Sequence, residues 1–196
     1  MLLLAGLIVD RTPFAWDRAI IVGLRQWDGP GWLREVAVNL TALGSPTVLT
    51  MVVVAASLFL AAERLWLTAL ATVAACASGG LAVEWLKVHV ARPRPTLVEH
   101  LVAVHNLSFP SGHAAGSATV YLTVAALATQ VVEAPAARRL ALVLAILLVG
   151  AIGISRVYLG VHWPSDVLAG WSFGTLWAIG WWQATAAARA SLGGER

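Results

Sequence analysis

Three short clusters of polar residues interrupt an otherwise apolar chain, and their residue types suit chemistry on a phosphoryl group. The first cluster holds Lys87 and Arg94, the second is the Pro-Ser-Gly-His run at 110–113, and the third contains His162 and Asp166. Positioned cations and N–H donors stabilise the negative charge that develops on a phosphoryl group during in-line displacement. An imidazole whose tautomer is fixed by a carboxylate can act as a nucleophile. Together the clusters predict phosphoryl transfer.

Each cluster falls where a helix is predicted to begin or end. Lys87 lies in the last turn of an apolar segment, where the helix dipole favours a cation. Ser111 is a predicted N-cap, Gly112 lets backbone approach a ligand, and free N–H groups at a helix start bind anions. Pro164 suits the first helical position and places Asp166 in the first turn. Taken singly, the clusters also fit a snorkelling lysine, an ordinary cap and a surface histidine; taken together, they favour one site.

The composition indicates that the solvent of this chain is lipid. Its 196 residues are 59% hydrophobic and 12% charged, with a mean hydropathy of +0.79. Soluble domains carry about 25% charged residues, so a water-soluble globule and a disordered chain are both excluded. The net charge of +3, without a run of basic residues, indicates no nucleic-acid partner. The sequence does not indicate an oligomeric state.

Long apolar segments predict an all-α integral membrane helical bundle with five to six transmembrane helices. About 20 apolar residues span a bilayer, and backbone groups in lipid must be paired within a helix. Residues 1–9 are read as a stub of a further helix, and 10–44 as short amphipathic helices at the surface. The whole chain, 1–196, is interpreted as one domain. The predicted spans are 45–62, 65–89, 114–132, 140–155 and 167–188.

Connectivity places the polar clusters at one membrane face. Linkers 90–113 and 156–166 are separated by an even number of crossings, so they share that face with 10–44. The opposite face receives Arg64, Arg138, Arg139 and Arg189. The positive-inside rule assigns that opposite face to the cytoplasm and the clusters to the extracytoplasmic side. Linker 96–109 and segment 10–44 are expected to shape the entrance, and Arg92 is read either as a guide for an anionic substrate or as a solvated flank.

In chain order, the clusters resemble the tripartite signature of the type 2 phosphatidic acid phosphatase (PAP2) superfamily. That signature reads K-x6-R-P, then P-S-G-H, then S-R-x5-H-x3-D. The matching positions are Lys87, Arg94-Pro95, Pro110-Ser111-Gly112-His113, Ser155-Arg156, His162 and Asp166. The motifs cover residues 87–166, and membrane members of this family usually have six spanning helices with the site at the outer surface.

The resemblance implies a role for each matched residue. His162 would attack phosphorus and become phosphohistidine, Asp166 would orient it, and His113 would protonate the leaving oxygen. The remaining positions would hold the phosphate oxygens: Lys87, Arg94, Ser111, Gly112 and Arg156. Neither a metal nor another cofactor is implied.

The predicted function is that of a metal-independent membrane lipid phosphatase in a prokaryotic cell (inner) membrane, acting on the terminal phosphate of a lipid phosphate or diphosphate. Candidate substrates are undecaprenyl diphosphate, phosphatidylglycerophosphate and phosphatidate. Two alternatives stay open at this point. One is a lipid phosphotransferase that uses the same phosphohistidine, and the other is a non-catalytic membrane protein that binds or transports an anion.

Overall fold

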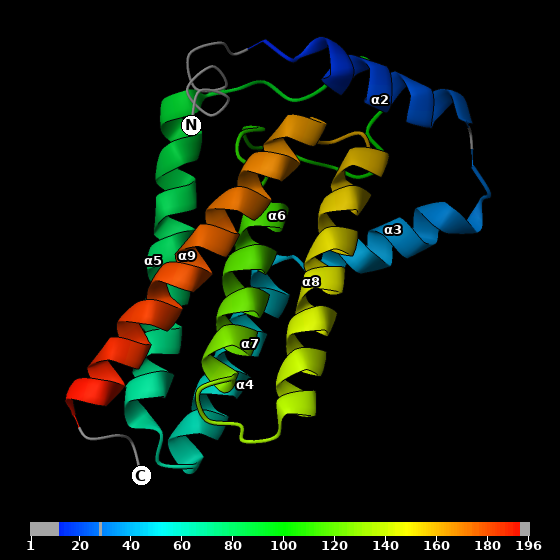
Figure 1. The fold of residues 1–196 in the computed structure, drawn as a ribbon. Helices are drawn as coiled ribbons and strands as arrows, with labels where there is room; N and C mark the ends of the chain where they lie inside the picture. Colours follow the sequence, from blue (N-terminus) through cyan, green and yellow to red (C-terminus); the bar gives the residue numbers. More distant parts are fainter. Residues whose placement is uncertain (1–11, 28, 193–196) are drawn as a thin grey trace.

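The computed structural model describes residues 12–27 and 29–192, and within these ranges the chain forms helices, turns and loops without a strand. The predicted all-α class is confirmed (Figure 1). The elements are α2 (Ala15–Trp27), α3 (Trp32–Ala42), α4 (Pro46–Ala62), α5 (Trp66–Val90), α6 (Gly112–Ser117), the π-helical turn η1 (Ala118–Leu122), α7 (Thr123–Ala128), α8 (Pro135–Tyr158) and α9 (Pro164–Ser191).

Helices form at every predicted apolar segment from 45 onward, although the one predicted at 114–132 ends at Ala128. Two of them, α5 and α8, are long and apolar enough to cross a membrane, and the pair α3–α4 qualifies as a third when its 48° bend is taken as one span. Residues 112–128 form one helical column, but η1 divides it into short pieces. Helix α9 is long enough to cross a membrane, but its tryptophans and glycines lower its mean hydropathy, so it is not among the helices that qualify by composition. The predicted stub at 1–9 lies outside the described residues.

The column 112–128 forms the centre of the bundle and packs against α9, α8 and α5. Glycines make the contact with α9 close: a Cβ on Gly170 would lie 2.9 Å from the backbone nitrogen of Ala115, and one on Gly174 would lie 2.4 Å from Cβ of Ala118. Apolar surface gains little from packing in lipid, so small residues that let backbones approach are what hold such helices together.

Helix α2 lies across one end of the bundle, beside the end of α8 and the start of α9 (Figure 1). Its Asp17 and Ile21 are buried, whereas Trp16, Ile20 and Trp27 are exposed. Exposed tryptophan and isoleucine beside a bundle end are typical of a helix at the membrane interface. Segment 10–44 therefore contributes one helix that caps the bundle and one, α3, that packs against α8.

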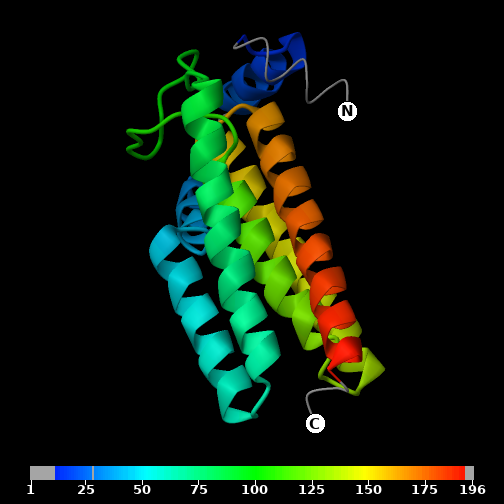
Figure 2. The ribbon, with the colours of Figure 1, turned by 90° about the vertical axis from the view of Figure 1, so that its left-hand side faces the viewer.

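The loops that carry the polar clusters all lie at this same end. Helix α5 ends at Val90, where Ala91 takes a left-handed conformation (φ 49°), and Pro93 and Pro95 keep the following residues out of a helix. The predicted N-cap is confirmed, since the Ser111 hydroxyl accepts a bond from the Ala114 amide. Figure 2 shows α4 and α5 side by side below these loops.

Candidate active site

His162 and Asp166 lie together at the start of α9 and are almost completely buried. The exposed fraction is 1% for His162 and 0% for Asp166. Nδ1 of His162 lies 3.6 Å from Oδ2 of Asp166 and 3.4 Å from the hydroxyl of Ser108, which itself donates to Oδ2 over 2.5 Å. The backbone N–H of Trp163 also donates to Oδ2, at 3.0 Å. The carboxylate is therefore fixed from two sides and faces one nitrogen of the imidazole.

The other imidazole nitrogen faces a cation. Nη1 of Arg94 lies 3.1 Å from Nε2 of His162 and 2.5 Å from the carbonyl oxygen of Val161. A guanidinium donates hydrogen bonds and never accepts them, so Nε2 is the acceptor and the ring proton belongs on Nδ1. Burial lowers the pKa of His162 to about 4, although the contact with Asp166 acts in the opposite direction. The ring is neutral at pH 7, and its Nε2 lone pair accepts from Arg94 in this structure, so the guanidinium must turn to another acceptor before Nε2 can attack.

Two further cations reach the same place from separate helices. Lys87, 4% exposed, ends its side chain next to Gly112, where a Cβ would lie 3.1 Å from Nζ. Arg156, also 4% exposed, donates to the Thr41 hydroxyl at 2.8 Å. Lys87 also pairs with Glu84, at 3.9 Å, whose side chain is 69% exposed. The site carries a strong positive charge that suits a phosphate dianion.

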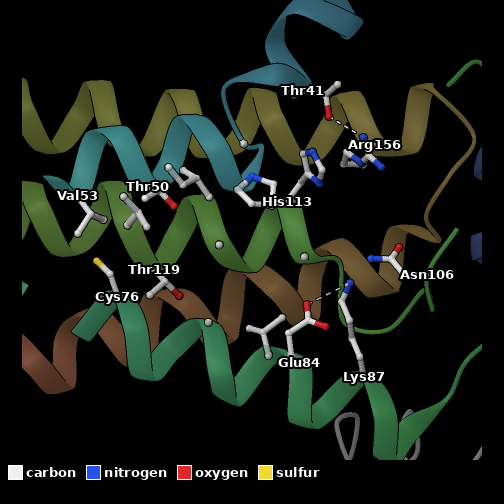
Figure 3. Close-up of a pocket in the computed structure, with 18 of the residues that line it drawn as sticks. Thr41, Thr50, Val53, Cys76, Glu84, Lys87, Asn106, His113, Thr119 and Arg156 are labelled. Atoms are coloured by element: carbon white, nitrogen blue, oxygen red, sulfur yellow. Dashed lines mark hydrogen bonds and ion pairs between the residues drawn. The ribbon is translucent and has the colours of Figure 1, made fainter. Parts of the chain in front are cut away.

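A single cavity of about 1190 Å³ brings most of the predicted residues together. Figure 3 shows Lys87, His113 and Arg156 pointing toward one another at one end of it. Six of the eight predicted site residues line this cavity: Lys87, Arg94, Gly112, His113, Arg156 and His162. Ser111 and Asp166 do not; both are fully buried behind its wall, where they fix the starts of α6 and α9.

The other end of the cavity is apolar and runs between α4 and α5. In Figure 3 it extends past Thr50 and Thr119 toward Val53 and Cys76. The apolar side chains that line it are Leu49, Val53, Val54, Leu58, Val73, Val83 and Val120. Cavity-lining residues 73–87 of α5 correspond to a length of about 21 Å at 1.5 Å per residue. One cavity therefore joins a polar, positively charged end to a long apolar groove.

Linker and surface segments complete the site, as the sequence predicts for the entrance. Residues 102–106 and residues Thr41 and Gly44 line the cavity. Asn106 holds Arg94 through both its backbone carbonyl, at 2.7 Å from Nε, and its side-chain oxygen. Sequence reasoning assigned no site role to Asn106, Ser108 or Thr41; a signal for the first two is their position within four residues of the Pro-Ser-Gly-His motif.

Both interpretations of Arg92 are wrong. The residue is 0% exposed and does not line the cavity, so it neither faces solvent nor guides a substrate. Its guanidinium instead contacts the carboxylates of Asp166 at 2.5 Å and Asp17 at 3.1 Å. Within the part of the chain that the structure describes, no group of three or more His, Cys, Asp or Glu residues could hold a metal ion.

The chain is similar to proteins of known type over most of its length. The sequence profile of the PAP2 superfamily matches residues 67–190. Phosphatidylglycerophosphatase B of Bacillus subtilis is 34% identical over 148 residues, which are 74% of this chain and 71% of that protein. An undecaprenyl-diphosphatase of Sulfolobus acidocaldarius is 33% identical over 91 residues, which cover 44% of this chain and 34% of the relative.

Solved structures give the same picture. The crystal structure of a transmembrane PAP2-type phosphatidylglycerolphosphate phosphatase from Bacillus subtilis superposes with a TM-score of 0.78 at 30% identity, over 85% of this chain and 83% of that one. LpxE of Aquifex aeolicus superposes with a TM-score of 0.67 at 25% identity, over 87% of this chain and 96% of that one.

Proposed function

This chain belongs to the PAP2 superfamily, and from that premise we propose that it removes the terminal phosphate of a lipid phosphate or diphosphate through a phosphohistidine on His162. It is a multi-pass membrane protein and a phosphatase. The observation that carries the proposal is the single cavity, with cations and two histidines at one end and an apolar groove at the other.

In the first step Nε2 of His162 attacks phosphorus, and the bond between phosphorus and the leaving oxygen breaks. His113 gives that oxygen a proton, so the lipid leaves as an alcohol or a monophosphate. Asp166 balances the positive charge that the attacking ring acquires, because it lies 3.6 Å from Nδ1. The product of this step is a phosphohistidine and a deprotonated His113.

In the second step a water molecule attacks the phosphohistidine. His113 takes one proton from that water, the bond between Nε2 and phosphorus breaks, and inorganic phosphate leaves. Both histidines return to their starting states. Lys87, Arg94 and Arg156 offset the charge on the phosphoryl oxygens in both steps, from three separate chain segments.

The apolar groove supports a lipid as the substrate. An alkyl tail gains little by leaving lipid for this groove, and the groove holds the tail in register with the phosphate. The chemistry of the cavity suits phosphatidylglycerophosphate, undecaprenyl diphosphate and phosphatidate alike, and two of these substrates are the ones named for its relatives.

We place the site at the extracytoplasmic face of a prokaryotic inner membrane. The loops and helix ends at the far end of the bundle carry Arg64, Arg138, Arg139 and Arg189. At the site end, Arg25 and Arg34 donate to loop carbonyls and Arg92 is buried. The positive-inside rule therefore assigns the far end to the cytoplasm.

The test is phosphate release by the purified full chain in nanodiscs, with phosphatidylglycerophosphate, undecaprenyl diphosphate, phosphatidate and lysophosphatidate as parallel substrates. We expect release from at least one of them without added metal, and none from His162→Ala. Assays in labelled water with a lipid alcohol present distinguish hydrolysis from transfer. Phosphate found mainly on the alcohol would assign a phosphotransferase, and release by His162→Ala would reject the nucleophile.

A further inference from the structure

We propose that Arg92 and Asp17 are positioning residues of the reaction: a buried chain of ion pairs leads from helix α2 through Arg92 to Asp166 and holds that carboxylate against His162. The proposal rests on the function proposed above, because it assigns Asp166 its place beside the nucleophile. Neither Arg92 nor Asp17 lines the substrate cavity, so both act through Asp166 and not on the lipid.

Arg92 is the centre of the chain. Its Nη1 donates to Oδ1 of Asp166 at 2.5 Å and to the Ser165 hydroxyl at 2.8 Å. Its Nη2 donates to Oδ2 of Asp17 at 3.1 Å. Ser108 and the Trp163 amide both donate to Oδ2 of Asp166, whereas Arg92 donates to Oδ1. The guanidinium lies 5.8 Å from the Trp163 ring, which covers it.

Asp17 fixes both Arg92 and the start of α9. Its Oδ1 accepts from the backbone N–H of Ser165 at 2.8 Å, and its Oδ2 accepts from the Ser165 hydroxyl at 2.6 Å. Ser165 directly precedes Asp166 in the first turn of α9. A carboxylate at a helix start is stabilised by the free N–H groups there. Asp17 therefore sets the position of the turn that carries Asp166.

Burial makes the arrangement rigid. Asp17, Arg92 and Asp166 are all 0% exposed, and the cation stands between the two carboxylates. A buried charge that loses its partner is far more costly than a buried pair, so none of the three can turn toward solvent. A displacement of about 1 Å at a reacting group can lower a rate about 100-fold, so this rigidity matters for His162.

Helix α2 is consequently part of the active site although it contributes nothing to the cavity wall. Its exposed side carries Trp16, Ile20 and Trp27, and its buried side carries Asp17 and Ile21. One face of this helix suits the membrane interface, and the other delivers a carboxylate to the ion-pair chain.

The test compares Arg92→Gln, Asp17→Asn and the double variant in nanodiscs, with Ile21→Ala as a matched control. Ile21 is 2% exposed on the same helix and takes no part in the ion pairs. We expect Arg92→Gln to lower kcat about 10- to 100-fold with KM changed less than about threefold. Asp17→Asn should lower kcat less than Arg92→Gln does. Arg92→Lys should have a kcat between those of the wild type and Arg92→Gln, because an ammonium keeps the charge but lacks the planar set of donors of the guanidinium. Ile21→Ala lowers the unfolding temperature but leaves kcat within about twofold.

The double variant separates positioning from stability. Arg92→Gln leaves two buried carboxylates facing each other, so it lowers the unfolding temperature, and adding Asp17→Asn removes one charge and restores part of the loss. Asp166 still lacks its cation, so kcat stays as low as in Arg92→Gln.

Recovery of kcat together with the unfolding temperature would overturn the proposal, as would a normal kcat for Arg92→Gln. If Arg92→Gln does not fold, the decisive variant is Asp17→Asn. A kcat for Asp17→Asn within about twofold of the wild type, as expected for Ile21→Ala, would then overturn the proposal. Activity that survives His162→Ala would instead reject the proposed function.

Discussion

The hydroxyl of Ser108 donates a hydrogen bond of 2.5 Å to Oδ2 of Asp166. The hydroxyl oxygen of Ser108 lies 3.4 Å from Nδ1 of His162. This distance is shorter than the 3.6 Å between Nδ1 and Oδ2 of Asp166. The serine thus lies where the ring proton of His162 points. Its hydroxyl can accept a hydrogen bond from Nδ1–H while it donates one to Asp166, so it links the ring to the carboxylate.

Ser108→Ala should lower kcat about 10-fold to 100-fold with little change in KM, since the ring loses an acceptor that fixes its orientation. The measurement is steady-state phosphate release in nanodiscs. Ser117→Ala is the matched control, because Ser117 is equally buried but bonds only to the Ala114 carbonyl of its own helix. Equal losses in the two variants would show that Ser108 has no specific role.

Lys87→Ala should lower kcat/KM by about 100- to 1000-fold, because the change removes a buried cation from the polar end of the cavity, where we propose that the phosphate binds. Glu84→Gln provides the contrast. Its carboxylate is 3.9 Å from Nζ and its side chain is 69% exposed, so solvent screens the pair and the change should stay within about threefold. A loss for Glu84→Gln as large as for Lys87→Ala would mean that the ion pair, and not the cation, is what matters.

Gly80→Leu should select against long tails. Gly80 lines the groove between α4 and α5, and a Cβ there meets no atom within 4 Å, so the larger side chain fits the fold and fills the groove. We expect KM for a long-chain phosphatidate to rise about 10-fold and that for a dihexanoyl analogue to change less than about twofold.

The control for Gly80→Leu is Gly150→Leu, at a glycine of α8 that also has open space around it and lies outside this cavity. It should leave both substrates unaffected. Equal effects of Gly80→Leu on the long and short substrates would contradict a tail-binding groove.

The burial of His162 should be visible in the pH dependence of stability. Burial lowers the pKa of His162 to about 4, whereas an unfolded imidazole titrates near 6.5. Between these values the unfolded chain binds the extra proton, so the wild type loses stability as the pH falls from 6.5 to 4. The loss relative to His162→Gln should reach about 3 kcal/mol.

Unfolding temperatures of the two proteins between pH 7 and pH 4 provide the measurement. As the pH is lowered across that window, the unfolding temperature of the wild type should fall faster than that of His162→Gln. Parallel curves would mean that the imidazole is protonated as easily as in solvent.

Much of this molecule could be predicted from the sequence, because the signals are strong and local. Apolar length defines the helices, and an even number of crossings brings residues 90–113 and 156–166 to one end. Ser111 and Pro164 mark helix starts through their own chemistry, and the structure places both there. The motif spacings then point to one site, and the family match agrees with them.

What the sequence could not indicate depends on distant partners. Arg92 stands two residues before Arg94 in an identical Arg-Pro context, yet one is fully buried and the other faces the cavity. The difference arises from Asp17, 75 residues away on a helix that reads as a surface element. The π-helical turn at 118–122 likewise has no local sequence signal.

The most direct test of the central claim is to look for the covalent intermediate. The full chain in nanodiscs is mixed with a lipid phosphate labelled at the terminal phosphorus, quenched in alkali within milliseconds and digested for mass spectrometry. We predict a phosphoryl group on His162 that is stable in alkali and lost in acid, with none on His113 and none in His162→Ala. Full turnover without label on His162, or label on a different residue, would contradict the account.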